Sequence, residues 1–262
     1  MVISLYQRLQ HALISNKAYF AWFMATLFYL YQYAIRVSPG MMIEAIREEF
    51  SVNAEQFATL GSATLFTYAI LQIPAGILMD IVGARRIILT SIALCTISTA
   101  ISAYTDEFWI MQFARVIAGI GSAAGFMSGI KIVVDNFKPG NRALLMGGTL
   151  SVGTGGAWIY GMLFGSETYG DWRQIFQYLA LAGGIIFILS YFLIAQPVKK
   201  TSKHREINVS NIFSQVIGIC KNPNIMIYAV LAISLYSPLS AMTDLWGKIF
   251  LKVRFGIEDN AA

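Results

Sequence analysis

Charged residues are scarce in this chain of 262 residues: only 13% are Asp, Glu, Lys or Arg, whereas 56% are hydrophobic. A soluble domain carries roughly a quarter charged residues, so this composition excludes an ordinary soluble protein. The net charge of +5 is spread between apolar runs rather than gathered in one patch, which excludes a nucleic-acid-binding surface. The mean hydropathy of +0.60 instead indicates a helical protein that crosses a membrane several times.

Cysteine and histidine are also rare, with two residues of each. Cys95 lies inside an apolar run and Cys220 beside one, so we expect no disulfide framework. His11 and His204 fall outside the apolar runs, and no clustered metal ligands or nucleophile–base set is present in the sequence. We therefore expect no metal, no cofactor and no enzymatic activity. Short alternating strands are missing, which excludes a transmembrane β-barrel, and we expect no cleavable signal peptide in residues 1–17.

Long apolar runs are what the chain has in abundance, and a run of about 20 residues spans a hydrocarbon core of roughly 30 Å. The predicted spans are residues 18–42, 57–79, 87–104, 108–134, 143–164, 175–194 and 225–245. We expect the first to be interrupted at Arg36 and at Ser38-Pro39-Gly40. An amphipathic surface helix is predicted at residues 207–219, and Asp244 lies late in the seventh span.

The predicted domain organisation has four parts. They are a cytoplasmic amino-terminal segment (1–17), a six-helix transmembrane bundle (18–195), a basic cytoplasmic linker (196–222), and a seventh transmembrane helix with its tail (223–262). Loop cations fall on one side of the membrane, which predicts that this side is the cytoplasm. These cations are Arg8, Lys17, Arg85, Arg86, Lys138, Arg142 and those of residues 199–205. Acidic turns fall on the other side.

A short polar hinge joins the second and third spans and reads Gly76-Ile77-Leu78-Met79-Asp80-Ile81-Val82-Gly83-Ala84-Arg85-Arg86. We expect Gly76 and Gly83 to let backbones approach closely, Asp80 to mark a helix end, and Arg85 and Arg86 to mark one membrane face. The pattern resembles the signature loop of the major facilitator superfamily. In that family the aspartate latches the cytoplasmic side against a helix end of the second half, so the resemblance implies this gating role for Asp80.

Further segments resemble the same superfamily. The stretch from Arg115 through Gly119 to Gly121 is similar to its fourth-helix motif, and Asp171-Trp172-Arg173 is similar to the signal before its sixth helix. The resemblance implies an all-α membrane fold: a six-helix half built from 3+3 inverted repeats, followed by a seventh helix that begins the second half. About five further helices of that fold would then be absent. The first helix resembles a bacterial branch that includes phagosomal nutrient transporters, which implies the bacterial inner membrane.

One face of the first span carries candidate substrate-binding residues. Tyr29, Tyr33 and Arg36 recur at helical spacing. An arginine inside a membrane is costly unless it is paired or faces water, and it can clamp a carboxylate or phosphate. The alternative is that Arg36 snorkels to the outer surface. Further candidates for the cavity are Gln32, Tyr68, Gln72 and Trp158.

Arg115 has two interpretations. By resemblance it shapes a coupling site together with Gly119 and Gly121; alternatively it is a structural arginine that hydrogen-bonds to backbone near the outer interface.

Lys131 is expected to snorkel at the cytoplasmic end. The middle of the first six spans contains no carboxylate, so this half shows no internal proton carrier.

The resemblance implies a secondary transporter that moves a small polar or anionic solute, such as an amino acid or another carboxylate, by alternating access across the lipid bilayer. The chain looks truncated on this interpretation. The alternative is a non-transporting remnant, or a half-transporter that pairs with a separate carboxyl-terminal half.

Overall fold

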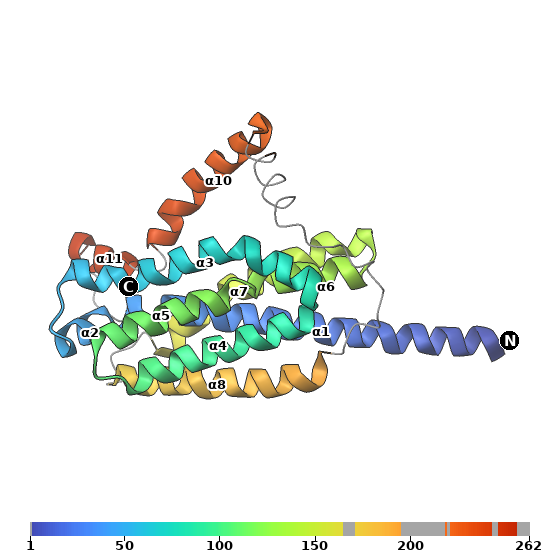
Figure 1. Cartoon of the computed structure of the whole chain (residues 1–262), viewed down its shortest axis with the longest axis horizontal. Helices are drawn as coiled ribbons and strands as arrows, with labels where there is room; N and C mark the ends of the chain where they lie inside the picture. Colours follow the sequence, from blue (N-terminus) through green and yellow to red (C-terminus); the bar gives the residue numbers. More distant parts are fainter. Residues whose placement is uncertain (1, 165–170, 195–217, 219–220, 243–245, 256–262) are drawn as a thin grey trace.

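The computed structural model describes residues 2–164, 171–194, 218, 221–242 and 246–255, and every regular element in this part is helical. In chain order the helices are α1 (Val2–Met41), α2 (Ile43–Glu49), α3 (Ala54–Val82), α4 (Ala84–Tyr104), α5 (Phe108–Ser122), α6 (Gly125–Asn136), α7 (Pro139–Phe164), α8 (Trp172–Leu193), α10 (Pro223–Ala241) and α11 (Gly247–Phe255). The long helices of the bundle run roughly parallel or antiparallel to one another, whereas α10 is inclined to them (Figure 1). The predicted all-α fold is confirmed.

Four described segments are long and apolar enough to cross a membrane: α3, α4, α8, and α5 with α6 taken as one unit over Phe108–Asn136. They match four of the predicted spans to within a few residues. A turn at Ala123 and Ala124 divides the last of these units into its two helices. Predictions for residues 207–219 and for Asp244 lie outside the described residues, apart from Gly218.

The first and fifth predicted spans differ from the helices of the structure. The first helix is not interrupted, because α1 continues through Arg36 and Pro39 to Met41. The fifth begins four residues early, at Pro139, which suits a first helical position because its missing N–H needs no partner there. Arg142 consequently lies inside α7, and its guanidinium donates to the carbonyl oxygens of Phe137 (2.9 Å) and Val134 (2.8 Å).

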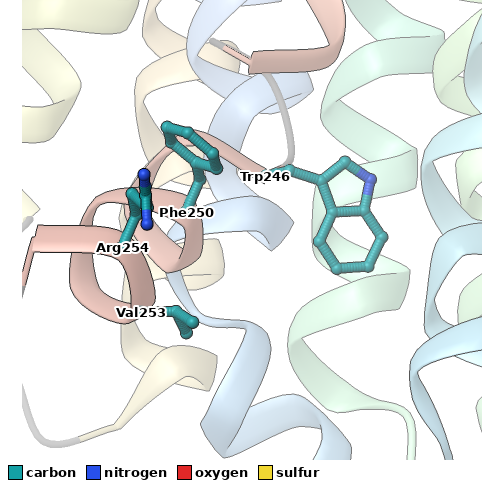
Figure 2. A pocket seen from close by; sticks show the side chains of 4 residues that line it. All are labelled: Trp246, Phe250, Val253 and Arg254. Atoms are coloured by element: carbon teal, nitrogen blue, oxygen red, sulfur yellow. The ribbon is translucent and has the colours of Figure 1, made fainter.

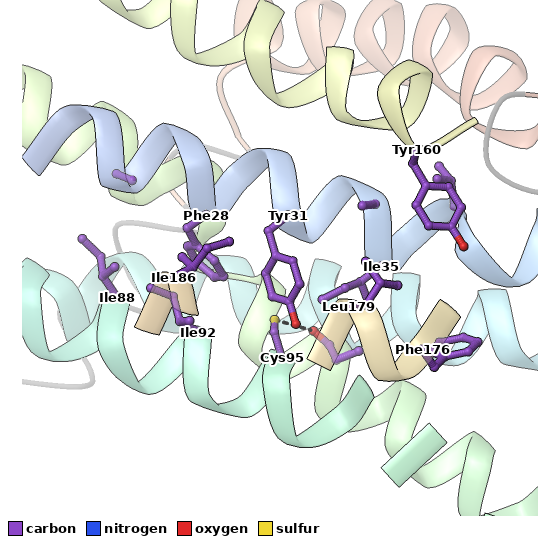
Figure 3. Packing of buried hydrophobic residues seen from close by; sticks show 14 of the residues in the cluster. Phe28, Tyr31, Ile35, Ile88, Ile92, Cys95, Tyr160, Phe176, Leu179 and Ile186 are labelled. Atoms are coloured by element: carbon purple, nitrogen blue, oxygen red, sulfur yellow. Dashed lines mark hydrogen bonds between the residues drawn. The ribbon is translucent and has the colours of Figure 1, made fainter. Parts of the chain in front are cut away.

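The core of the bundle forms where α1, α4 and α8 meet. Phe28 from α1, Ile92 from α4 and Phe176 from α8 are fully buried and belong to one hydrophobic cluster. Figure 3 shows Phe28 close to Ile92, with Phe176 at the other end of the drawn cluster. At the same junction, the hydroxyl groups of Tyr31 and Thr99 lie 3.3 Å apart and share a hydrogen bond. This packing fixes the orientation of α1, which presents its opposite side to α6 and α7.

The hinge between α3 and α4 depends on Gly83. Its φ of +96° lies in the region that favours glycine, which allows α4 to begin directly after α3 ends. The expected close backbone approach at Gly76 is wrong for the described residues, since a Cβ added there, as at Gly83, would meet nothing within 4 Å. The role of Gly83 is therefore conformational.

A polar network ties helix ends together at the end of the bundle opposite this hinge. The Arg173 guanidinium, at the start of α8, donates to Glu49 Oε1 (3.0 Å), to the Thr105 carbonyl oxygen (2.6 Å) and to Asp106 Oδ1 (3.0 Å). Trp172 Nε1 also donates to the Glu49 carboxylate. The ends of α2, α4 and α8 are thereby joined around one guanidinium.

Candidate functional site

Five polar and aromatic side chains from three helices gather where α10 meets the bundle. They are Tyr29, Tyr33 and Arg36 of α1, Tyr68 of α3 and Tyr236 of α10, and we name them the tyrosine–arginine cluster. The sequence places the first three on one face of α1 because they recur every three or four residues. The carboxyl-terminal part of α10 supplies the opposing tyrosine.

Direct contacts join α1 to α10 within this cluster. The hydroxyl oxygens of Tyr33 and Tyr236 lie 3.2 Å apart and share a hydrogen bond, and Arg36 Nη1 donates to the Tyr236 hydroxyl at 3.2 Å. The Arg36 guanidinium carbon also lies 5.4 Å from the ring centroid of Tyr33 and 5.9 Å from that of Tyr236, within the range of cation–π attraction. The structure therefore turns this guanidinium toward the aromatic rings of α1 and α10.

Tyr29 and Tyr68 border the same space. The Tyr29 ring packs edge-on against Tyr33, with centroids 5.4 Å apart, and lies 5.3 Å from the ring of Phe126 on α6. Tyr68 lies within electrostatic range of Arg36 and Tyr236. Its hydroxyl accepts a hydrogen bond of 2.8 Å from Gln72 Nε2, so these two candidate residues are in direct contact on α3.

Two sequence candidates lie outside this cluster. Gln32 is buried between α1 and α6, with its Oε1 against Gly125, and this oxygen has no hydrogen-bond donor among the described residues. Trp158 on α7 is 69% exposed and makes no ring contact with another described residue. Gln32 therefore borders the cluster, because the Cβ that would meet its Oε1 at Gly125 would also lie 3.6 Å from Tyr29 Cδ2, whereas Trp158 makes no ring contact with a member of it.

Sequence reasoning missed Tyr236. Its contact with Arg36 spans 200 positions of the chain, so no local spacing indicates it. One signal is present nevertheless: Tyr236 precedes Ser237-Pro238, and the same Ser-Pro pair occurs in α1 as Ser38-Pro39, directly after the tyrosine–arginine face. An internal similarity of this kind is expected when a fold is built from repeated halves.

Arg115 is fully buried on α5 and donates a hydrogen bond to the backbone of α1. Pro39 has no N–H, so the Ile35 carbonyl four residues earlier lacks its helical partner. Arg115 Nη1 donates to this carbonyl oxygen at 3.0 Å, and Ser38 Oγ donates to it at 2.9 Å. The arginine therefore replaces the missing hydrogen bond one residue away from Arg36, which agrees with the structural interpretation of Arg115.

The two glycines that follow Arg115 are packing positions. A Cβ at Gly119 would lie 2.7 Å from the Thr64 carbonyl oxygen of α3, and one at Gly121 would lie 2.7 Å from Cys95 Sγ of α4. Both distances are shorter than real Cβ contacts, so these glycines let α5 approach its two neighbours. Their role is to let α5 pack closely against α3 and α4.

The hinge residues engage partners within the same bundle. Lys131 Nζ lies 2.9 Å from Asp80 Oδ1 and 3.2 Å from Asp135 Oδ2, so α3 and α6 are linked by a cation between two carboxylates. Arg85 Nη2 donates to the Tyr191 carbonyl oxygen at 2.6 Å, which links the start of α4 to the end of α8. Arg86 is exposed. Lys131, predicted as a snorkelling residue, pairs with Asp80 and Asp135 at this end of the bundle.

A separate apolar recess lies at α11, lined by Trp246, Phe250, Val253 and Arg254 (Figure 2). It contains none of the residues singled out from the sequence. No cluster of three or more His, Cys, Asp or Glu side chains that would suit a metal ion occurs among the described residues. The tyrosine–arginine cluster is therefore the best candidate for solute recognition.

Comparison with known proteins gives a family match. The family model described as Major Facilitator Superfamily matches residues 21–260. Among curated relatives, the D-galactonate transporter of Escherichia coli is 26% identical over 171 residues, which are 64% of this chain and 39% of the relative. The Danio rerio protein spinster homolog 3 is 21% identical over 242 residues, which are 90% of this chain and 48% of the relative. The Candida albicans MFS antiporter QDR1 is 28% identical over 145 residues, which are 54% of this chain and 28% of the relative.

Solved structures agree on the fold. A bacterial homologue of the human lysosomal transporter Spinster, in an inward-facing and unoccupied conformation, superposes with a TM-score of 0.71 at 18% identity, covering 93% of this chain and 57% of that one. A D-xylose–proton symporter gives a TM-score of 0.60 at 17% identity, covering 92% of this chain and 63% of that one. The chain thus spans about a quarter to two thirds of the length of the proteins it matches. These relatives are transporters rather than enzymes, which confirms the expectation of a non-enzymatic protein.

Proposed function

The chain belongs to the major facilitator superfamily, and from this premise we propose that it is the amino-terminal half of a secondary transporter for a small polar or anionic solute, together with the first helix of the second half. Members of the superfamily are integral membrane proteins that act within the lipid bilayer. In this proposal α1 and α10 are equivalent first helices of the two halves, and the solute path passes between them.

The observation that carries the proposal is the position of Arg36. Its guanidinium lies over the ring of Tyr33 and donates to Tyr236, so it faces the helix of the second half. A guanidinium can bind a carboxylate or phosphate through two parallel hydrogen bonds, and such charge-assisted bonds are roughly twice as strong as neutral ones. The phenol groups of Tyr29 and Tyr68 add hydroxyl groups and apolar ring faces for the rest of the solute.

The names of two relatives support the proposal that the solute is an anion. One is the D-galactonate transporter, and another is the probable sulfoacetate transporter of Cupriavidus necator, which is 24% identical over 175 residues. Both named compounds are organic anions. Amino acids, other carboxylates and organophosphates share the anionic group that Arg36 is suited to bind, and the proposal covers this class.

A second candidate function is that the chain transports only when paired with a separate carboxyl-terminal half. The apolar surface of α3 and α10 is available for such a partner or for lipid: Phe66 and Ile70 on α3 are 70% and 67% exposed, and Leu235 on α10 is 77% exposed. A partner bundle would cover part of this surface. On either account we propose that the protein lies in the bacterial inner membrane, as the resemblance of its first helix implies. We further propose that its amino terminus is cytoplasmic, as the loop cations predict.

Reconstitution into liposomes tests both candidates. Uptake of radiolabelled amino acids, sugar acids and organophosphates is measured for the chain alone and together with a matching carboxyl-terminal half, with a neutral sugar as the control. The proposal expects saturable uptake of at least one anion that exceeds uptake of the neutral sugar. Uptake only in the paired sample supports the half-transporter, and no uptake of any anion in either sample contradicts the proposal.

A further inference from the structure

Tyr29 is held in a notch between two helices. On one side a Cβ added to Gly153 of α7 would overlap ring atoms Cδ1 and Cε1 of Tyr29 and lie 2.9 Å from Cγ. On the other side a Cβ added to Gly125 of α6 would lie 3.6 Å from ring atom Cδ2. The ring of Tyr29 therefore occupies the space that a side chain at position 153 would need.

The remaining directions around Tyr29 determine where its ring would go if this space were filled. Phe126 and Tyr33 block two of them, with ring centroids 5.3 and 5.4 Å from that of Tyr29. The backbones of α1 and α7 also approach closely beside Tyr29, since at Gly156 a Cβ would lie 2.6 Å from the Leu30 carbonyl oxygen. Tyr68 and Tyr236, which lie within electrostatic range of the Tyr29 hydroxyl, are members of the cluster itself. A displaced ring would thus enter the space between α1, α3 and α10.

We infer that Gly153 is a specificity-determining position: by leaving room for the Tyr29 ring against α7, it sets how much space the tyrosine–arginine cluster offers a solute. This inference rests on the proposed function. Gly153 itself touches no solute and acts through Tyr29, so it is a positioning residue. A larger residue at 153 narrows the site and disfavours wide solutes, whereas a smaller residue at 29 widens it.

The chain offers a matched control on the same helix. A Cβ at Gly155 would meet nothing within 4 Å, so Gly155→Ala makes the same chemical change as Gly153→Ala without displacing Tyr29. A reporter thiol is introduced by Tyr68→Cys in a background with Cys95→Ala and Cys220→Ser. The rate at which a reagent labels this thiol measures how accessible the site is. Two methanethiosulfonate reagents serve as probes, the small ethylammonium compound and one with a bulky biotin group. Labelling needs no transport, so this test remains valid if the proposed function fails.

The expected result is that Gly153→Ala slows labelling of the reporter thiol by the bulky reagent by roughly tenfold, because the displaced Tyr29 ring narrows the path to the thiol. The small reagent should be much less affected. Adding Tyr29→Ala restores the rate, and Gly155→Ala leaves it unchanged. Equal rates in the Gly153→Ala and Gly155→Ala variants overturn the inference. So does a slowed rate that Tyr29→Ala does not restore, because α7 itself would then have moved.

A second variant covers the case in which Gly153→Ala does not fold. If Gly153→Ala does not give a monodisperse protein in detergent, Tyr29→Ala alone still decides the question. The inference expects this variant to label faster with the bulky reagent. An unchanged rate would mean that the Tyr29 ring does not limit the site, and the inference would be abandoned.

Discussion

Arg115 and Ile35 form a side chain–backbone pair that joins α5 to α1: Nη1 of the arginine donates to the carbonyl oxygen of the isoleucine at 3.0 Å. The carbonyl is available because Pro39 has no N–H to offer it. The pair explains why α1 remains helical through a proline, and it fixes the backbone beside Arg36. The buried guanidinium is thus part of the framework of the candidate site.

This relationship predicts a coupling between Arg115 and Pro39. Arg115→Met should lower the apparent unfolding temperature in detergent, because the Ile35 carbonyl loses a charged donor, a loss worth about 1–3 kcal/mol. In a Pro39→Ala background the new N–H at position 39 can take the place of the arginine, so the same substitution should cost less. A double-mutant cycle measures the difference, which should reach about 0.5–3 kcal/mol. Strictly additive effects would contradict the proposed pairing.

Two adjacent glycines of α8 should respond oppositely to alanine. A Cβ at Gly183 would overlap the Tyr31 hydroxyl and Thr96 Oγ1, whereas a Cβ at Gly184 would meet nothing within 4 Å. Gly183→Ala should therefore destabilise the bundle by about 1–3 kcal/mol through overpacking. Gly184→Ala should be neutral or stabilise it by up to about 1 kcal/mol through helix propensity. Thermal unfolding of both variants in one detergent distinguishes them, and Tyr31→Phe should partly rescue the first.

The network around Arg173 should be sensitive to a change that keeps its charge. Arg173→Lys cannot reach Glu49, Asp106 and the Thr105 carbonyl at once, because an ammonium group lacks the forked geometry of a guanidinium. We expect a loss of about 1.5–3 kcal/mol, the usual value for hydrogen bonds to charged groups. Arg86→Lys, at an exposed position, is the matched control and should change stability by less than about 0.5 kcal/mol. Similar losses in both variants would argue against the network.

Substitution of Asp80 should have a small effect on the stability of the isolated chain. Its bridge to Lys131 is partly exposed, with side-chain exposures of 67% and 31%, and such pairs contribute about 0–1 kcal/mol. Asp80→Asn should therefore change the unfolding temperature little, and it should have no further effect when combined with Lys131→Met. We expect a shift in inward versus outward thiol accessibility only when a carboxyl-terminal half is supplied. A large stability loss in the isolated chain would assign Asp80 to local folding instead.

Features that depend on local sequence could be predicted well. The lengths of α3, α4 and α8 follow from uninterrupted apolar runs, and the turn at Gly83 follows from a polar hinge between two of them. The face of Tyr29, Tyr33 and Arg36 follows from helical periodicity alone.

Features that depend on distant partners could not be predicted. Pro39 reads as a helix breaker, and the donor that compensates for it comes from Arg115, 80 positions from Ile35 in the chain. Tyr236 completes the cluster from 200 positions away. Gly76 matches a family motif, yet its surroundings are open, because a spacing of glycines does not reveal which neighbour faces each one.

Equilibrium binding of an anionic solute to wild-type protein and to Arg36→Ala tests the account most directly. Radiolabelled D-galactonate is the first probe, followed by amino acids and organophosphates, with D-galactose as the neutral control. The account predicts saturable binding of at least one anion to the wild type, weakened roughly 10- to 100-fold in Arg36→Ala through loss of a charge-assisted hydrogen bond. An unchanged affinity in Arg36→Ala would contradict it.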